Sequence, residues 1–100
     1  MIYLRWGKSE IEGIERFGLS HIVTECGADG SVLREIGFDD ADMPVHRAPI
    51  PPAIFLFDSQ LVDLSNKISV MSAAQFDAAW LDAGLPPNNS FKPNPLRGSA

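Results

Sequence analysis

The side chains best able to do covalent chemistry in this sequence are Cys26 and two histidines, His21 and His46. A cysteine becomes a nucleophile when a neighbour stabilises its thiolate, so Cys26 with either histidine could form a catalytic pair. The alternative is a buried cysteine that packs as a small apolar side chain, as free cysteines usually do. The sequence has no glycine-rich phosphate loop, CxxC pair, HExxH motif or GxSxG elbow. We therefore expect that the protein is not an enzyme.

Three aspartates within four residues, Asp39, Asp40 and Asp42, form the second chemically distinctive group. Their spacing loosely resembles the start of a calcium loop, but the loop's glycine at position six and glutamate at position twelve are missing. We therefore expect no metal ion and no other cofactor. Two interpretations remain open. The aspartates could bond their own backbone in a solvated turn, or they could present negative charge to Lys or Arg of a partner.

The aspartates follow the clearest strand pattern in the chain. Two β-type runs, residues 22–26 and 31–38, flank the pair Asp29-Gly30, which suits the positive φ angles of a tight hairpin. A third run, residues 43–48, is expected at a sheet edge because its proline cannot donate a ladder hydrogen bond. Residues 1–6 are also typical of a strand. We therefore predict an antiparallel β-meander of about four strands, with a further possible strand at Ile54–Phe57.

Side-chain alternation along residues 32–38 predicts two different sheet faces. Val32, Ile36 and Phe38 share one face with Arg34 between them. Leu33, Glu35 and Gly37 share the other. One face is thus expected to be mainly apolar and the opposite face mixed.

The C-terminal half contains the strongest helix pattern. Ser72 and Gln75 have the spacing of a capping box, Phe76 and Trp80 are four residues apart, and a glycine follows Ala83 at the position of a C-cap. We predict a helix from Ser72 to Ala83 whose aromatic side chains pack on one face of the sheet. The fold class is therefore α+β.

Near the N-terminus, Ser9 and Glu12 also have capping-box spacing, before Ile11, Ile14 and Phe17. They predict either a short helix or a loop, because Gly13 in the middle disfavours a helix. We predict a single domain over residues 1–85. Residues 86–100, with four prolines, are expected to form a mobile tail.

The charge balance excludes some partners. Thirteen Asp and Glu side chains face eight Lys and Arg, a formal charge of −5, and residues 1–82 hold all thirteen acidic but six basic side chains, a net of −7. Such a domain is repelled by phosphate backbones, so we expect no nucleic-acid binding and a basic protein as partner.

Hydropathy and cysteine content predict the compartment. The longest apolar run, residues 53–57, is far shorter than the roughly 18 residues of a membrane span, and no signal-peptide pattern is visible. The single Cys26 cannot form an internal disulfide. We therefore expect no membrane contact and a cytoplasmic location.

Several motifs together resemble a known group of proteins. Residues 32–39 have the form V-x-R-E-I-G-F-D, residues 45–47 are V-H-R, and residues 76–80 are F-x-x-x-W. This pattern resembles small bacterial immunity proteins of polymorphic toxin systems, although their turn usually has a glycine near Asp42. The resemblance implies a single-domain inhibitor of a toxin. Many such toxins are nucleases with basic clefts, and an acidic inhibitor can imitate the charge of their substrate.

The hypothesis from the sequence is therefore an immunity protein that binds a cognate toxin through acidic side chains and catalyses no reaction. The proposed partner-binding residues are Asp39, Asp40, Asp42, Glu25, Glu35 and Asp29. One alternative is a phage- or plasmid-encoded antagonist of a host defence complex. Another is a dimerisation or scaffold module that uses the apolar run at Ile54–Phe57.

Overall fold

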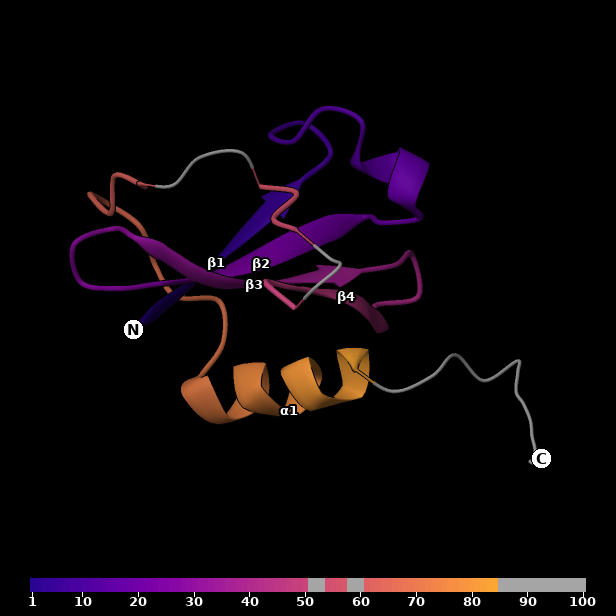
Figure 1. Ribbon diagram of the computed structural model, residues 1–100. Helices are drawn as coiled ribbons and strands as arrows, with labels where there is room; N and C mark the ends of the chain where they lie inside the picture. Colours follow the sequence, from indigo (N-terminus) through magenta and orange to yellow (C-terminus); the bar gives the residue numbers. More distant parts are fainter. Residues whose placement is uncertain (51–53, 58–60, 85–100) are drawn as a thin grey trace.

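The computed structural model describes residues 1–50, 54–57 and 61–84. Four antiparallel strands form one sheet in the order β1-β2-β3-β4. They are β1 (Ile2–Gly7), β2 (His21–Cys26), β3 (Val32–Phe38) and β4 (Pro44–Ala48). One helix, α1 (Ala73–Ala83), lies against one face of the sheet (Figure 1). The predicted α+β meander with a C-terminal helix is confirmed.

The β2–β3 hairpin closes where the Asp29-Gly30 pair predicts, but only Gly30 of the pair adopts a positive φ. Gly30 has φ +88, and its N–H donates to the Gly27 carbonyl. The register then shifts: Glu25 pairs with Arg34, whereas Cys26 pairs with Val32. This bulge moves Val32 to the face opposite Ile36, so the predicted simple alternation is wrong at Val32, which packs in a different cluster.

The core beneath α1 forms from one face of the sheet. Four buried strand residues meet Phe76 of the helix, and Ala79 and Trp80 pack against them. The strand residues are Tyr3, Val23, Ile36 and Phe38. The helix packing predicted from the spacing of Phe76 and Trp80 is confirmed.

The second face of the sheet is also covered, which the sequence pattern did not predict. Ile11, Ile14 and Leu19 pack with Phe57 around Ile22 of β2. Figure 1 shows these segments on the side of the sheet opposite α1. Strand side chains on this face are therefore buried rather than solvent-exposed.

The ends of α1 form as its sequence predicts. The Ser72 hydroxyl accepts from the Gln75 backbone N–H at 3.1 Å, and the Gln75 side-chain Oε1 accepts from the Ser72 backbone N–H at 2.8 Å. Gly84 is the C-cap, although its φ of −86 is right-handed, so no left-handed cap is made.

The predicted capping box at Ser9 and Glu12 does not form. The segment contains a single 3₁₀ turn, η1 (Ile14–Phe17), bounded by Gly13 and Gly18 at φ +81 and +76. Because glycine adopts these angles freely, the chain turns in and out of η1 within a few residues. Ile11 and Ile14 are buried, whereas Phe17 is 57% exposed.

Residues 54–57 are not a strand, so the prediction of a further strand there is wrong. The N–H groups of Leu56 and Phe57 donate to the Glu35 carboxyl group and not to a neighbouring strand. The predicted tail at 86–100 lies outside the described residues. Among residues 1–50, 54–57 and 61–84, no helix has the length and hydropathy needed to cross a membrane.

Candidate functional site

The structure does not gather the six proposed carboxylates into one patch. Asp29 lies in the turn that precedes β3, and the three aspartates Asp39, Asp40 and Asp42 lie in the turn that follows it. These turns are at opposite ends of the strand. Glu25 and Glu35 lie between them, on β2 and β3, and both are buried.

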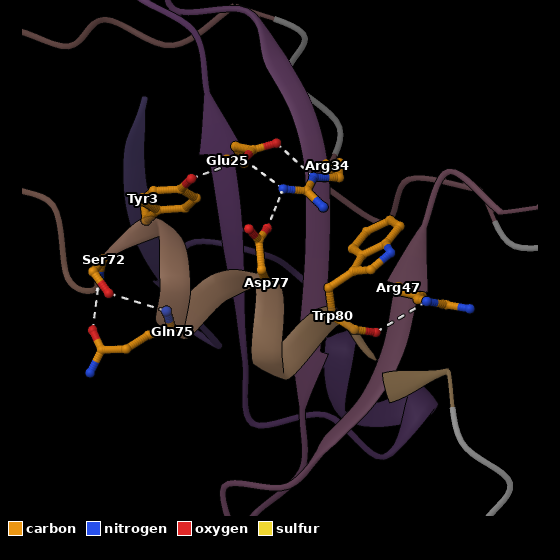
Figure 2. Close-up of polar contacts among 8 residues, drawn as sticks. All are labelled: Tyr3, Glu25, Arg34, Arg47, Ser72, Gln75, Asp77 and Trp80. Atoms are coloured by element: carbon orange, nitrogen blue, oxygen red, sulfur yellow. Dashed lines mark hydrogen bonds and ion pairs between the residues drawn. The ribbon is translucent and has the colours of Figure 1, made fainter. Parts of the chain in front are cut away.

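Glu25 holds Arg34, the residue that bonds the helix. Its carboxylate accepts two hydrogen bonds from Arg34, at 2.7 and 2.8 Å, and one from the Tyr3 hydroxyl at 2.9 Å. Arg34 also donates to Asp77 of α1 at 2.9 Å (Figure 2). The Arg34 hydrogen bonds, with that from Tyr3, hold the pKa of Glu25 below its usual value although burial opposes this. Glu25 is therefore an ionised structural residue without a free surface.

Aromatic rings from the helix complete this network. The Arg34 guanidinium lies 4.9 Å from the ring centroids of both Phe76 and Trp80. Arg47 lies 5.2 Å from the Trp80 ring and donates to the Trp80 carbonyl oxygen near the end of α1. Figure 2 shows Trp80 between the two arginines. Arg34 thus links β2, β3 and α1 through charge and stacking.

Glu35 has a comparable structural role on the opposite face. Its side chain is fully buried, and its two oxygens accept from the N–H groups of Leu56 and Phe57 at 2.6 and 3.0 Å. His46 Nε2 lies 2.8 Å from the same carboxyl group. Glu35 therefore fixes the segment 54–57 on the sheet. It is buried away from any partner, like Glu25, so neither belongs to the surface proposed below.

Asp29 mainly shapes its own turn. Its Oδ1 accepts from the backbone N–H and the hydroxyl of Ser31, at 3.0 and 2.7 Å. The side-chain and backbone hydrogen bonds from Ser31 lower the pKa of Asp29, so it stays ionised near neutral pH. This is an Asx-type turn in the hairpin.

In the turn between β3 and β4, which we call the acidic turn (residues 39–43), one aspartate bonds its own backbone, as one of the two interpretations made from the sequence predicts. Asp39 Oδ1 accepts from the N–H groups of Ala41 and Met43, both at 2.9 Å, so this aspartate bonds its own backbone. Asp42 has φ +61, a left-handed angle that glycine, asparagine and aspartate adopt most readily. Asp39 therefore shapes the turn that presents the other two aspartates.

The remaining aspartates of the acidic turn point into solvent. The side chains of Asp40 and Asp42 are 86% and 85% exposed. Lys8 Nζ lies 3.9 Å from Asp40, an exposed pair that contributes at most about 1 kcal/mol. His21 Nε2 lies 3.8 Å from Asp42. Asp29 is also exposed but uses one carboxylate oxygen in its own turn, whereas Asp40 and Asp42 accept no hydrogen bond from the part of the chain that the structure describes.

His21 does not neutralise Asp42 near neutral pH. The ring is buried, stacks on Phe38 at 4.9 Å, and has Nδ1 2.7 Å from the Ser20 hydroxyl. Burial lowers the pKa of His21 below its usual 6.5, Arg5 lowers it further, and Asp42 only partly opposes these effects. The imidazole is therefore neutral at pH 7, and the charge of Asp42 stays uncompensated by it.

This burial predicts a specific dependence of stability on pH. Because the folded chain binds a proton at His21 less readily than the unfolded chain, the free energy of unfolding should fall as the pH drops below about 6.5. In His21→Gln, the decrease between about pH 7.5 and pH 5.5 should be smaller than in the wild type. Urea unfolding at both pH values measures the difference. An equally steep decrease in the variant would assign the effect to another group.

The structure does not assemble the cysteine–histidine pair considered above. Cys26 is fully buried, and its Sγ lies 3.5 Å from the Thr24 hydroxyl. His21 is at the other end of β2, and His46 pairs with Glu35. In the part of the chain that the structure describes, no three His, Cys, Asp or Glu side chains converge as metal ligands.

Sequence reasoning missed Asp77, Lys8 and the contact of His21 with Asp42. No local pattern identifies them, because Asp77 meets Arg34 across 43 residues of sequence. The pairing of Glu25 with Arg34 follows from the hairpin register, in which the two residues are direct partners.

Comparison with known proteins adds no relative: no family model, no curated protein and no solved structure matches this chain.

Proposed function

We propose that this protein is an inhibitor that binds a basic protein, and that Asp40 and Asp42 of the acidic turn guide and contact that partner. The observation that carries the proposal is the exposure of both carboxylates, 86% and 85%, at a turn where the adjoining histidine is neutral. The formal charge of −5 supports the same conclusion. Exposed charge of one sign accelerates the encounter with a partner of opposite sign.

The setting that we propose is toxin immunity in the bacterial cytoplasm. The motifs of β3, β4 and α1 resemble those of immunity proteins, and the reduced Cys26 is compatible with a reducing compartment. A toxin that cleaves nucleic acid needs a basic cleft, and the acidic turn offers it carboxylates in place of phosphates. Rapid capture favours charge-steered association, because a toxin must be bound before it acts.

The function is tested by co-expression with the product of the adjacent gene. The proposal expects that this product stops growth when expressed alone, that co-expression restores growth, and that the two proteins purify as a complex. A neighbouring gene product that is harmless alone and does not bind would contradict the assignment as an immunity protein.

The role of the acidic turn is tested by Asp40→Lys combined with Asp42→Asn. Asparagine is chosen at position 42 because it tolerates the left-handed φ of +61, and Asp39 is kept because it shapes the turn. The association rate with the basic partner at low salt should fall by about tenfold or more. Stopped-flow mixing at two ionic strengths measures this rate and its salt dependence.

A matched control changes the charge by the same amount elsewhere. Asp82→Lys lies on α1, and Asp29→Asn lies at the opposite end of β3 and keeps the oxygen that accepts from Ser31. This double variant should associate within about threefold of the wild-type rate, because only the net charge changes. If the association rate falls by the same factor in both double variants, the acidic turn has no specific role.

A further inference from the structure

A groove lies along β1, at the sheet edge opposite β4. Two hollows of about 470 and 260 Å³ adjoin there, and both are lined by Trp6, Glu10 and Lys67. Phe57 forms part of the larger hollow, with its ring centroid 4.7 Å from that of Trp6. Asp63 also lines the larger hollow. Arg5 lines the smaller hollow and is a second cation beside Lys67. The larger hollow, which Arg5 does not line, combines an aromatic wall with two carboxylates.

A cation from the chain itself already occupies the aromatic wall. Lys67 Nζ lies 5.4 Å from the centroid of the Trp6 ring. A positive charge over an indole is attracted by the negative face of the ring. The position of Lys67 thus shows that the exposed part of this ring is electrostatically suited to a cation.

The charges of the larger hollow are not balanced. Glu10 and Asp63 contribute two carboxylates, and Lys67 is the single cation among the lining residues that the structure describes. Within the described residues, the Glu10 carboxylate accepts from the Gly7 N–H and the Asp63 carboxylate accepts from the Ser65 N–H. The Ser65 hydrogen bonds lower the pKa of Asp63, which stays ionised near neutral pH.

Exposed aliphatic side chains surround this charged groove. Leu61, Ile68 and Val70 are 70%, 83% and 51% exposed, and each lines one of the two hollows. An aromatic anchor with neighbouring aliphatic groups and a charged rim is the composition of a protein-binding surface.

We propose that this groove binds an arginine side chain of a partner protein, with the guanidinium stacked on Trp6 between Glu10 and Asp63, and that Lys67 is its internal competitor. Arginine fits better than lysine, because the guanidinium is planar, is more weakly hydrated and bonds carboxylates through two donors. The inference does not depend on the acidic turn, since it uses other residues at the other edge of the sheet.

The probe for this site is a blocked arginine, N-acetyl-arginine N-methylamide, titrated into the full chain. Nuclear magnetic resonance follows the Trp6 indole N–H, which donates to Thr24 Oγ1 at 2.9 Å and thus reports on a fixed ring. Trp80, on the opposite face, is an internal reference. We expect a saturable shift at Trp6 and none at Trp80. Blocked citrulline, which has the same shape without the charge, should produce no saturable shift at Trp6.

The role of Lys67 gives the sharpest test, because its removal should improve binding. In Lys67→Gln, the blocked arginine should bind about two- to fivefold more tightly, since the competing cation is gone. Glu10→Gln and Asp63→Asn keep a side-chain oxygen that can accept from the Gly7 and Ser65 N–H groups, and should each weaken binding about twofold or more. Asp82→Asn on α1 removes the same charge far from the groove and should leave the affinity unchanged. Equal shifts with arginine and citrulline, or unchanged or weaker binding in Lys67→Gln, would overturn the proposal.

Discussion

Replacing Glu35 with glutamine should lower the free energy of unfolding by about 2 to 4 kcal/mol. The carboxyl group is fully buried and accepts from two backbone N–H groups, those of Leu56 and Phe57. Glutamine has one acceptor oxygen, so its amide nitrogen must face one of these donors and leaves a buried N–H unpaired. Urea unfolding at neutral pH measures the loss.

Hydrogen exchange distinguishes this mechanism from a general loss of stability. The amides of Leu56 and Phe57 should exchange faster in Glu35→Gln than the global destabilisation alone predicts, because their acceptor is the altered group. Glu12→Gln, an exposed glutamate in the loop before η1, is the matched control and should change stability by at most about 0.5 kcal/mol. A stability of Glu35→Gln equal to that of the control would show that the carboxyl group does not hold this segment.

Replacing Arg34 with methionine should cost about 3 to 5 kcal/mol. The substitution keeps an apolar side chain beside Phe76 and Trp80 but leaves the Glu25 carboxylate buried without its two hydrogen bonds from the guanidinium. A buried charge that has lost its partner destabilises the fold much more than the replacement of both charged residues by neutral ones. The double variant Arg34→Met with Glu25→Gln should therefore recover part of the loss, and urea unfolding of all four proteins measures this coupling.

The same pair predicts how the loss depends on pH. Arg34 holds the pKa of Glu25 below its unfolded value of 4.5, so the pair stabilises the fold above that pH. This stabilisation is lost as the pH falls through the folded pKa. The difference between wild type and Arg34→Met should accordingly be smaller near pH 3 than at pH 7. A difference that does not change with pH would mean that Glu25 is not the partner that matters.

Both networks explain why the acidic surface is smaller than the composition suggests. Glu25 and Glu35 contribute negative charge to the chain but use it inside the fold. Glu25 bonds Arg34, which in turn bonds Asp77 of α1, and Glu35 fixes residues 54–57. Among the described residues, the exposed carboxylates lie in turns and loops and on α1, where Asp77 and Asp82 are exposed. A basic partner would bind Asp40 and Asp42 of the acidic turn, and an arginine of a partner would bind Glu10 and Asp63 in the groove along β1.

The sequence alone determined the parts of this protein that depend on neighbouring residues. The Asp29-Gly30 turn, the capping box of Ser72 and Gln75, and the spacing of Phe76 and Trp80 each involve residues within four positions. Their geometry follows from local backbone angles and helical periodicity, and the α+β meander follows from them. The role of Asp39 in its own turn was a local option of the same kind.

Only the tertiary structure decided which carboxylates are free. Alternation placed Glu35 on a mixed face, but segments from residues 8–20 and 54–57 cover that face and bury it. Arg34 finds Asp77 across 43 residues. The bulge at Cys26 turns Val32 to the other side. These outcomes depend on how distant segments pack. The periodicity of a sequence predicts helices, strands and their faces, but it does not identify which distant residue contacts a given side chain.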